Sequence, residues 1–308
     1  TRVLPKRGIV AAPDEILITL GSQNALYLLT RLLLSSTTRI GVENPCFREA
    51  INTFLLADAE VVPHPVDEEG IVLNERPCDY YYVTPGHQVP TGVTMSSARR
   101  RQLLEHAARH DAVIIEDDYD SESNFTLNPL PALKASDRSG RVVYVSSLSK
   151  ALSPGLRLGF MVADPDLIDE ARALRRLVYR HPPTNIQYQM AHFLAQGHYE
   201  THLRRYHYDS AQRWERLHAA LQRYLPSCRA LAGSEHANAF WLQTPAQINT
   251  QQLTWRAAHA GVLIEPGARH FLSAAPPDNY FRMGFHAINP DAIAQGVEVL
   301  RGQLEQMG

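Results

Sequence analysis

The chain has 308 residues, 44% hydrophobic and 20% charged, which is the composition of an ordinary globular protein with a sizeable core. A formal net charge of −2 gives no overall attraction to nucleic acid or to an anionic membrane, so any contact with DNA would need another segment. The three cysteines lie far apart without a CxxC pair, and no apolar run has the length of a transmembrane helix. We therefore expect a cytoplasmic protein without disulfides or membrane spans.

Short apolar segments alternate with helix-like segments through the first half of the chain. Strands are expected at 16–20, 39–43, 59–64, 79–83, 112–116 and 141–145, and helices at 24–34, 46–57 and 96–109. This alternation predicts an α/β fold with a mainly parallel, doubly wound sheet. In such a sheet the ligand binds beyond the carboxyl ends of the strands.

The pattern changes in the second half of the chain. Helices are expected at 166–178, 184–195, 197–224, 249–260 and 290–305, and strands near 238–243, 262–265 and 280–284. This order predicts a smaller C-terminal α+β domain. We place the boundary so that residues 1–200 form the large domain and 201–308 the small one.

Lys150 stands directly after the predicted strand 141–145, with hydroxyl and cationic groups around it. A lysine that forms a Schiff base needs burial or neighbouring cations to lower its pKa. Ser147, Ser149 and Arg157 suit the phosphate of the same cofactor, since arginine offers a planar fork of donors. The turn Gly21-Ser22-Gln23, between a predicted strand and helix, would add backbone N–H groups to that phosphate site.

Asp117 and Tyr119 follow the predicted strand 112–116. A carboxylate beside a pyridine nitrogen keeps that nitrogen protonated, and a phenol can donate to the ring oxygen, so pyridoxal phosphate would explain both residues together with Lys150. Two alternatives remain for the acidic run Glu116-Asp117-Asp118. It could be a solvated loop, or the divalent metal site of a hydrolase.

Four further residues are candidates for contact with the cofactor or its ligand. Phe47 could stack on the ring or simply pack in the core at a helix start. His87 and Gln88 lie in a loop whose prolines and glycines specify a fixed conformation, and either could reach the ring. Arg282, in the predicted strand 280–284, is a candidate for binding a substrate or effector carboxylate, or else an ordinary surface arginine.

The motifs in chain order resemble those of fold-type I pyridoxal-phosphate-dependent transferases, the aspartate aminotransferase superfamily. They are GSQ, ENPCF, TPGHQVPTG, EDDYDSE and SSLSKALSPGLRLGF. HQVPTG, EDDYDSE, HPPTNIQ and GHYETHLRR resemble more specifically the aminotransferase-like domain of MocR/GabR-type transcriptional regulators of the GntR family. The resemblance covers nearly the whole chain.

The resemblance implies a role for each matching residue. Lys150 would hold pyridoxal phosphate as an internal aldimine, Asp117 would contact the pyridine nitrogen and Tyr119 the ring oxygen, and Arg282 would bind a carboxylate. The phosphate contacts would come from Gly21, Ser22, Gln23, Ser147, Ser149 and Arg157. The chain departs from the family pattern in having Cys46-Phe47 where Gly-Tyr is usual, and in the stretch SESNF.

Members of this family carry a winged helix-turn-helix ahead of this domain. No such segment occurs in the chain, and the phosphate loop lies so near its start that we expect N-terminal residues of the domain to be missing. The resemblance also implies a homodimer, because fold-type I sites usually lie at a dimer interface. DNA would then be contacted only through the upstream domain.

Two functions share these site residues. In the first, the chain senses an amino compound, which binds as an external aldimine at Lys150 and changes a transcriptional regulator. In the second, the chain is a free-standing aminotransferase that moves an amino group between an amino acid and a 2-oxo acid. The sequence favours the regulator on its subfamily motifs.

Three other patterns give no separate functional prediction. Ser147-Leu148-Ser149-Lys150 matches the Ser-x-x-Lys of penicillin-binding proteins, but the SDN and KTG motifs do not occur. His198 and His202 have a zinc-like spacing without the HExxH arrangement, so no metal site is predicted. The arginine run 99–101 is expected to lie on a solvated helix face.

Overall fold

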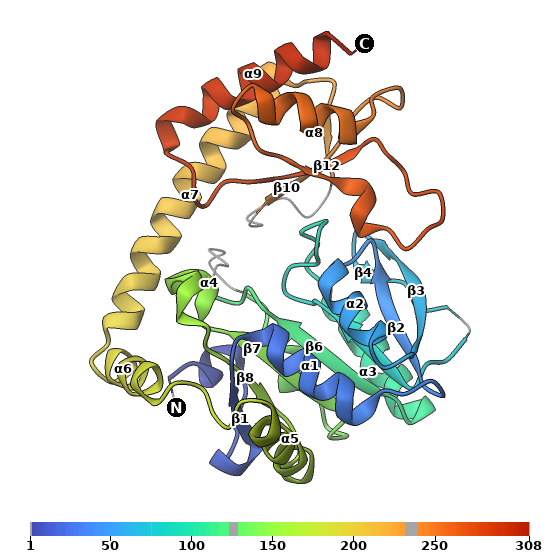
Figure 1. Ribbon diagram of the computed structural model, residues 1–308, viewed down its shortest axis with the longest axis vertical. Coiled ribbons are helices and arrows are strands. Elements are labelled where there is room, and N and C mark those ends of the chain that lie inside the picture. The colour runs from blue at the N-terminus through green and yellow to red at the C-terminus, as the bar shows by residue number, and fades with distance from the viewer. Residues whose placement is uncertain (1, 75, 123–128, 232–238, 308) are drawn as a thin grey trace.

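The computed structural model describes residues 2–74, 76–122, 129–231 and 239–307, which form two sheets with helices around them (Figure 1). The larger sheet has the strand order β1-β8-β7-β6-β5-β2-β3-β4. Parallel pairs join β7, β6, β5, β2 and β3, and antiparallel pairs add β8, β1 and β4 at the edges. The predicted α/β fold with a mainly parallel sheet is confirmed. The strands are β1 Ile16–Thr19, β2 Arg39–Asn44, β3 Glu60–Asp67, β4 Gly70–Ile71, β5 Tyr80–Val83, β6 Val113–Asp118, β7 Val142–Ser147 and β8 Gly159–Val162.

Helices cover both faces of this sheet because successive strand residues point to opposite sides. On β6, Ile115 packs in the core that α1 (Ser22–Leu33), α2 (Arg48–Leu55) and α5 (Pro165–Val178) complete. Its neighbour Ile114 packs on the other face, with Leu103 of α3 (Ser97–His110). The sheet is therefore doubly wound, as the alternation of elements predicts.

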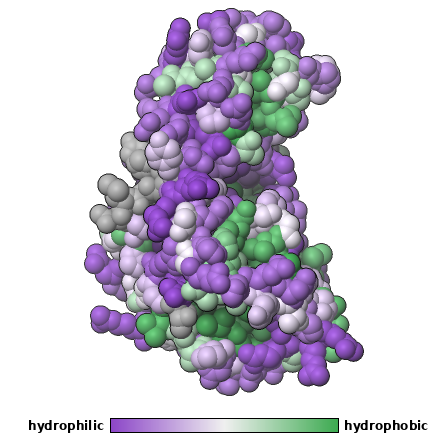
Figure 2. Space-filling model, turned by 90° about the vertical axis from the view of Figure 1, so that its left-hand side faces the viewer, coloured by the Kyte–Doolittle hydropathy of each residue, from purple (hydrophilic) through white to green (hydrophobic). Residues whose placement is uncertain are grey.

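The smaller sheet has the order β11-β12-β10-β9 and is antiparallel throughout. Its strands are β9 Arg229–Ala230, β10 Ala239–Gln243, β11 Glu265–Pro266 and β12 Tyr280–Gly284. Residues of α7 (His198–Tyr224), α8 (Thr250–His259) and α9 (Ile293–Glu305) share its hydrophobic core. The predicted C-terminal α+β unit is confirmed, although residue 238 of the expected strand lies outside the described part of the chain. Figure 2 shows this smaller lobe above the larger one.

Helix α7 connects the two sheets (Figure 1). Tyr199 and Leu203, near its start, pack in a core with residues of β7, β8 and α6 (Thr184–Ala195). Leu217 and Leu221, near its end, pack in the core of the smaller sheet. The boundary proposed at residues 200 and 201 falls within this helix and stays a prediction.

No helix in the described ranges combines the length and the apolar character needed to cross a membrane.

Candidate functional site

A cavity of about 500 Å³ opens where the carboxyl ends of the parallel strands face the smaller sheet. This is the position at which doubly wound sheets bind ligands. Its lining comes from both sheets and includes nine of the predicted site residues: Ser22, Gln23, Phe47, Asp117, Tyr119, Ser147, Lys150, Arg157 and, from β12, Arg282. The predicted residues therefore converge on one volume although they are far apart in the sequence.

The start of α1 forms one end of the cavity. Gly21 has a φ of 79°, which favours glycine, and no side chain caps the helix that follows it. Arg157 lies beside this turn and donates from Nη2 to Leu20 O at 3.3 Å. A Cβ atom at Gly159 would lie 2.7 Å from Ser22 N, so β8 packs directly against the turn. Uncapped N–H groups next to a guanidinium form a suitable site for a phosphate.

Asp117 presents its carboxylate to the cavity from β6. The side chain is buried, with Asp117 3% exposed, and Tyr82 Oη donates to Oδ2 at 2.8 Å. The other oxygen, Oδ1, is buried and has no hydrogen-bond partner in the described chain. Burial raises the pKa of Asp117 to about 7, and the charge of Asp118 adds to this effect. An unpartnered buried carboxylate oxygen at a cavity wall is suited to a ligand that brings an N–H donor.

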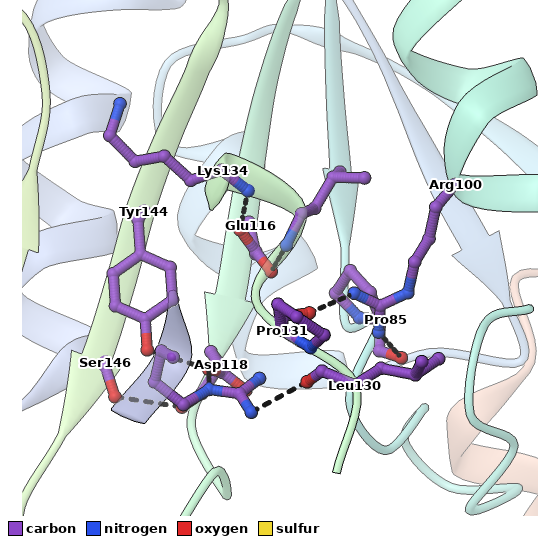
Figure 3. Close-up of polar contacts among 11 residues, drawn as sticks. Pro85, Arg100, Glu116, Asp118, Leu130, Pro131, Lys134, Tyr144 and Ser146 are labelled. Atoms are coloured by element: carbon purple, nitrogen blue, oxygen red, sulfur yellow. Dashed lines mark hydrogen bonds and ion pairs between the residues drawn. The ribbon is translucent and has the colours of Figure 1, made fainter. Parts of the chain in front are cut away.

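The residues on either side of Asp117 point to the opposite face of β6. Figure 3 shows Glu116, Asp118 and Tyr144 in a buried polar layer there. Asp118 Oδ2 accepts from Arg7 Nε and from Tyr144 Oη, each at 2.7 Å, and Glu116 accepts from two backbone N–H groups of the 133–134 segment. These contacts hold β6 in place behind the cavity.

The same polar layer corrects the expectation for the arginine run 99–101. Arg100 is only 8% exposed and donates to the carbonyl oxygens of Pro85 and Pro131 (Figure 3). It also donates from Nε to Met95 O. The expectation of a wholly solvated helix face was wrong, because Arg100 lies on the side of α3 that packs on the sheet. Guanidinium groups can be buried where carbonyl oxygens satisfy their donors.

Lys150 enters the cavity from α4 (Ser149–Leu152), directly after β7. Its Nζ lies 3.2 Å from Asp120 Oδ1 and 4.3 Å from the centre of the Tyr119 ring. Burial lowers the pKa of Lys150, the Asp120 carboxylate opposes this shift, and the charge of Arg282 adds to it. A lysine of lowered pKa at a cavity wall is suited to nucleophilic attack on a carbonyl.

The chain contains three lysines, Lys6, Lys134 and Lys150. Lys6 pairs with Glu200 at 3.3 Å, and Lys134 Nζ donates to Val142 O at 2.7 Å, so both are held elsewhere. Lys150 is the lysine that lines the cavity.

Of the four residues predicted to contact the cofactor ring, Phe47 and Tyr119 line the cavity and His87 and Gln88 do not. Tyr119 Oη donates to His87 O at 3.1 Å. The His87 side chain turns to Asp120, with Nδ1 3.0 Å from Oδ2. Gln88 Nε2 donates to Val89 O in its own loop and to Pro45 O in the segment between β2 and α2. Neither side chain is among those that line the cavity, so their contact with a ring stays a prediction.

The predicted phosphate serines are placed differently from each other. Ser147 lines the cavity, and its Oγ accepts from Ser149 N at 3.2 Å. Ser149 is buried, and its Oγ accepts from Leu158 N at 3.2 Å. The Ser149 hydroxyl therefore joins α4 to the segment before β8 and is not part of the cavity wall.

Several residues that line or adjoin the cavity were not predicted from the sequence, among them Asp120, Glu265 and Arg269. Asp120 is the ion-pair partner of Lys150, and its only signal was its place in the acidic run. Glu265 and Arg269 line the cavity together with Arg282, and Glu265 Oε2 lies 3.3 Å from Arg282 Nη1. Their segment has no motif that would have marked it. Of the departure SESNF, residues 123–125 lie outside the described residues.

The metal alternatives are not supported by the geometry. Glu116 and Asp118 point away from Asp117, as described above, and His202 Nε2 lies 2.7 Å from Ala151 O while His198 packs near the Phe193 ring. Among the described residues, no group of three or more His, Cys, Asp or Glu side chains could hold a metal ion.

The doubly wound sheet and its lysine-bearing cavity define a fold-type I transferase architecture. The chain belongs to the aminotransferase class I and II family, whose model matches residues 6–300. LysN of Thermus thermophilus, an α-aminoadipate aminotransferase solved in complex with N-(5'-phosphopyridoxyl)-L-leucine, is 28% identical with a TM-score of 0.90. That match covers 99% of this chain and 82% of LysN.

Two regulators are also similar in sequence. The HTH-type transcriptional regulator TauR of Rhodobacter capsulatus is 39% identical over 299 residues, covering 96% of this chain. The probable rhizopine catabolism regulatory protein MocR of Rhizobium meliloti is 34% identical over 299 residues, also covering 96% of this chain. The chain spans 61% and 60% of the lengths of these two regulators.

Proposed function

We propose that the chain is the pyridoxal-phosphate-binding, effector-sensing domain of a GntR/MocR-type transcriptional regulator. The observation that carries this proposal is the buried, unpartnered Oδ1 of Asp117 in the same cavity wall as Lys150 and Arg157. A pyridine nitrogen that carries a proton satisfies that oxygen, and the similarity to two regulators over 96% of the chain supports the regulatory class.

The residues that line the cavity fit this cofactor. The first N–H groups of α1, at Ser22 and Gln23, bind its phosphate together with Ser147 and Arg157. Asp117 would keep a proton on the ring nitrogen, and Phe47 would be available to pack against the ring. When bound, pyridoxal phosphate supplies an aldehyde conjugated to an electron-withdrawing ring.

Lys150 and its neighbours prepare the site for an amino compound. The lowered pKa of Lys150 keeps a larger share of its amine uncharged, and Asp120 and the Tyr119 ring hold its Nζ in place. Lys150 would yield its place on the cofactor to an incoming primary amine, while Arg282 would be available for an anionic group of the ligand. The Lys150 side chain would then be free to carry a proton within the cavity.

The partners are part of the same proposal. DNA is bound through a winged helix-turn-helix that precedes this domain in the whole protein, which acts in the cytoplasm. A second copy of the chain completes a homodimer. Apolar side chains on α5, α6 and α7 support this, since Leu177, Tyr188 and Tyr208 are 85%, 72% and 66% exposed. Static light scattering of the reconstituted chain tests this, and we expect the mass of a dimer.

A second candidate function is favoured by the structural match to LysN, an aminotransferase. In this case the chain, or the protein that contains it, completes amino-group transfer from an amino acid to a 2-oxo acid. The two functions differ in one measurable respect. A sensing domain binds the amine and keeps it, whereas an aminotransferase releases a 2-oxo acid over many turnovers.

The proposal is tested by reconstituting the purified chain with pyridoxal phosphate and reducing it with borohydride. We expect a visible absorption band in the unreduced protein and, after reduction, a cofactor-modified peptide that contains Lys150. Lys150→Ala should abolish both, whereas Lys6→Ala and Lys134→Ala should retain both. Because the chain has only three lysines, the peptide map is unambiguous. Modification at Lys6 or Lys134 with an unmodified Lys150 would overturn the proposal.

The same preparation separates the two functions. Titration with an amino acid should shift the visible band, and addition of a 2-oxo acid should then give no more than one equivalent of new amino acid for each site. Continuous release of a new 2-oxo acid would instead establish the aminotransferase.

A further inference from the structure

One wall of the cavity carries four charged side chains of alternating sign, which we call the charge row. It consists of Glu49, Arg269, Glu265 and Arg282, all of which line the cavity. Glu49 Oε1 lies 3.3 Å from Arg269 Nη2, Arg269 Nη1 lies 3.6 Å from Glu265 Oε1, and Glu265 Oε2 lies 3.3 Å from Arg282 Nη1. The row therefore connects α2, beside the larger sheet, with β12 in the smaller one.

The contact between the Glu265 and Arg282 side chains follows from the pairing of their strands. Glu265 of β11 and Arg282 of β12 are directly paired residues of antiparallel strands. Directly opposed side chains on one face of such a pair lie close together whatever else binds nearby. Their exposed side-chain fractions are 32% and 26%, so the pair is partly shielded from water and is screened less than a surface pair.

Glu265 has further partners besides Arg282. His270 Nε2 lies 3.4 Å from its Oε1, and Arg269 holds the same oxygen. The contact with His270, with the charges of Arg282 and Arg269, lowers the pKa of Glu265 to about 2 against the effect of burial. Glu265 is therefore a carboxylate at every physiological pH, and it keeps partners if Arg282 is taken from it.

Arg282 is the residue expected to bind an anionic group of the ligand, yet it already holds an internal carboxylate. We propose that Glu265 is a specificity-determining residue of this cavity: it occupies Arg282 in the free protein, so that the carboxylate of an incoming amino acid must compete with it. The site then gains little from a carboxylate on the ligand. It accepts primary amines that lack a carboxylate almost as well as amino acids of the same size.

This inference deepens the proposed function and rests on it, because the amine is bound where Lys150 and the cofactor meet. It has a separate basis in the charge row, which contains no cofactor atom. The guanidinium of Arg282 has five donors in a fixed fork, and Glu265 accepts from Nη1, one of the two nitrogens that an end-on bidentate carboxylate contacts. Competition for that nitrogen is the physical origin of the effect.

The test is a titration of the pyridoxal-phosphate-loaded full chain with L-alanine and with isopropylamine. The two amines differ in that a methyl group replaces the carboxylate. We expect the wild-type chain to bind them with similar dissociation constants, as followed by the visible band. Glu265→Gln should bind L-alanine more tightly, on the order of tenfold, with isopropylamine unchanged. Glu265→Asp, which shortens the reach to Arg282, should give a smaller change of the same sign.

Two controls identify the cause. Arg282→Gln combined with Glu265→Gln should lose the gain for L-alanine. Glu298→Gln removes one negative charge from exposed α9, where Glu298 pairs with Arg301, and should leave both dissociation constants unchanged. Weaker binding of L-alanine by Glu265→Gln, or an equal change for both amines, would overturn the proposal.

A second readout does not need the cofactor. Succinate should raise the melting temperature of the cofactor-free Glu265→Gln chain more than that of the cofactor-free wild type, because Arg282 is then unoccupied. If the loaded protein shows no visible band, the proposed function fails while this measurement still decides the inference about Glu265. An equal effect of succinate on both chains would count against the inference alone.

Discussion

The Asp117 carboxylate is suited to binding the cofactor, but its burial lowers the stability of the folded chain when it is charged. The carboxylate is buried, Tyr82 satisfies only one oxygen, and burial raises its pKa to about 7. Between about pH 4 and pH 7 the folded, cofactor-free chain keeps a proton on Asp117 that the unfolded chain has lost. The stability contributed by this proton is complete below that window and is lost as the pH rises through it.

We therefore predict that Asp117→Asn stabilises the cofactor-free chain at pH 8. The gain should be on the order of 2 kcal/mol, since the buried charge is removed but the new amide N–H groups lack partners. Urea unfolding at pH 5 and pH 8 measures it, and the difference from the wild type should nearly vanish at pH 5. The same variant should bind pyridoxal phosphate more weakly, because the ring nitrogen loses its counter-charge. A variant less stable than the wild type at pH 8 would contradict the prediction.

The sequence could predict those site residues that directly follow a strand or begin a helix. Asp117, Ser147 and Lys150 belong to this group, and their positions at the sheet edge follow from the strand pattern. Arg157, two residues before β8, was predicted from its guanidinium and its spacing from Lys150. His87 and Gln88 lie in a loop, where the direction of each side chain depends on contacts with distant segments. Glu265 could not be found for the same reason, since its partner Arg282 is adjacent only after β11 and β12 pair.

At the scale of elements, the phosphate end of the cavity depends on a close approach of two backbones. Strand β8 contacts the turn before α1 at Gly159, where a Cβ atom would lie 2.5 Å from the carbonyl carbon of Gly21. The atoms that it would meet belong to the backbone and cannot rotate away. Any side chain at this position must move α1 relative to β8.

We predict that Gly159→Ala destabilises the chain by about 2 kcal/mol or more, because it overpacks a rigid contact. It should also weaken binding of pyridoxal phosphate, since the N–H groups of Ser22 and Gln23 move. Urea unfolding and cofactor titration measure the two effects. Gly302→Ala is the matched control: Gly302 lies in α9 with nothing within 4 Å of a new Cβ, and alanine there should stabilise by up to about 1 kcal/mol. Equal stability of Gly159→Ala and the wild type would refute the close-packing argument.

The elements themselves were predictable because their hydrophobic periods are clear. The strand and helix expected at 141–145 and 166–178 correspond to Val142–Ser147 and Pro165–Val178. What the pattern could not give was the orientation of polar residues within an element. Arg100 lies in a helix that was predicted correctly, but its burial depends on carbonyl oxygens from outside that helix, at Met95, Pro85 and Pro131.

At the scale of the whole molecule, α7 belongs to two cores at once. Leu203 packs with residues of the larger sheet, and Leu217, fourteen residues later on the same helix, packs with those of the smaller one. The separation of these cores supports a division of the chain into two cooperative units that meet within α7. The proposed boundary near residue 200 would then lie before the actual change of partner along the helix.

We predict that Leu217→Ala and Leu203→Ala affect different parts of the molecule. Each removes buried side-chain volume at a cost of about 2–5 kcal/mol, with Leu217 2% and Leu203 9% exposed. Hydrogen exchange followed by mass spectrometry should show that Leu217→Ala lowers protection in β10, β12 and α9 and leaves β6 and β7 unchanged. Leu203→Ala should lower protection around β8 and α6 and leave α9 unchanged. Loss of protection throughout both sheets in either variant would mean that the chain unfolds as one unit. The cavity between the two sheets would then open only on global unfolding.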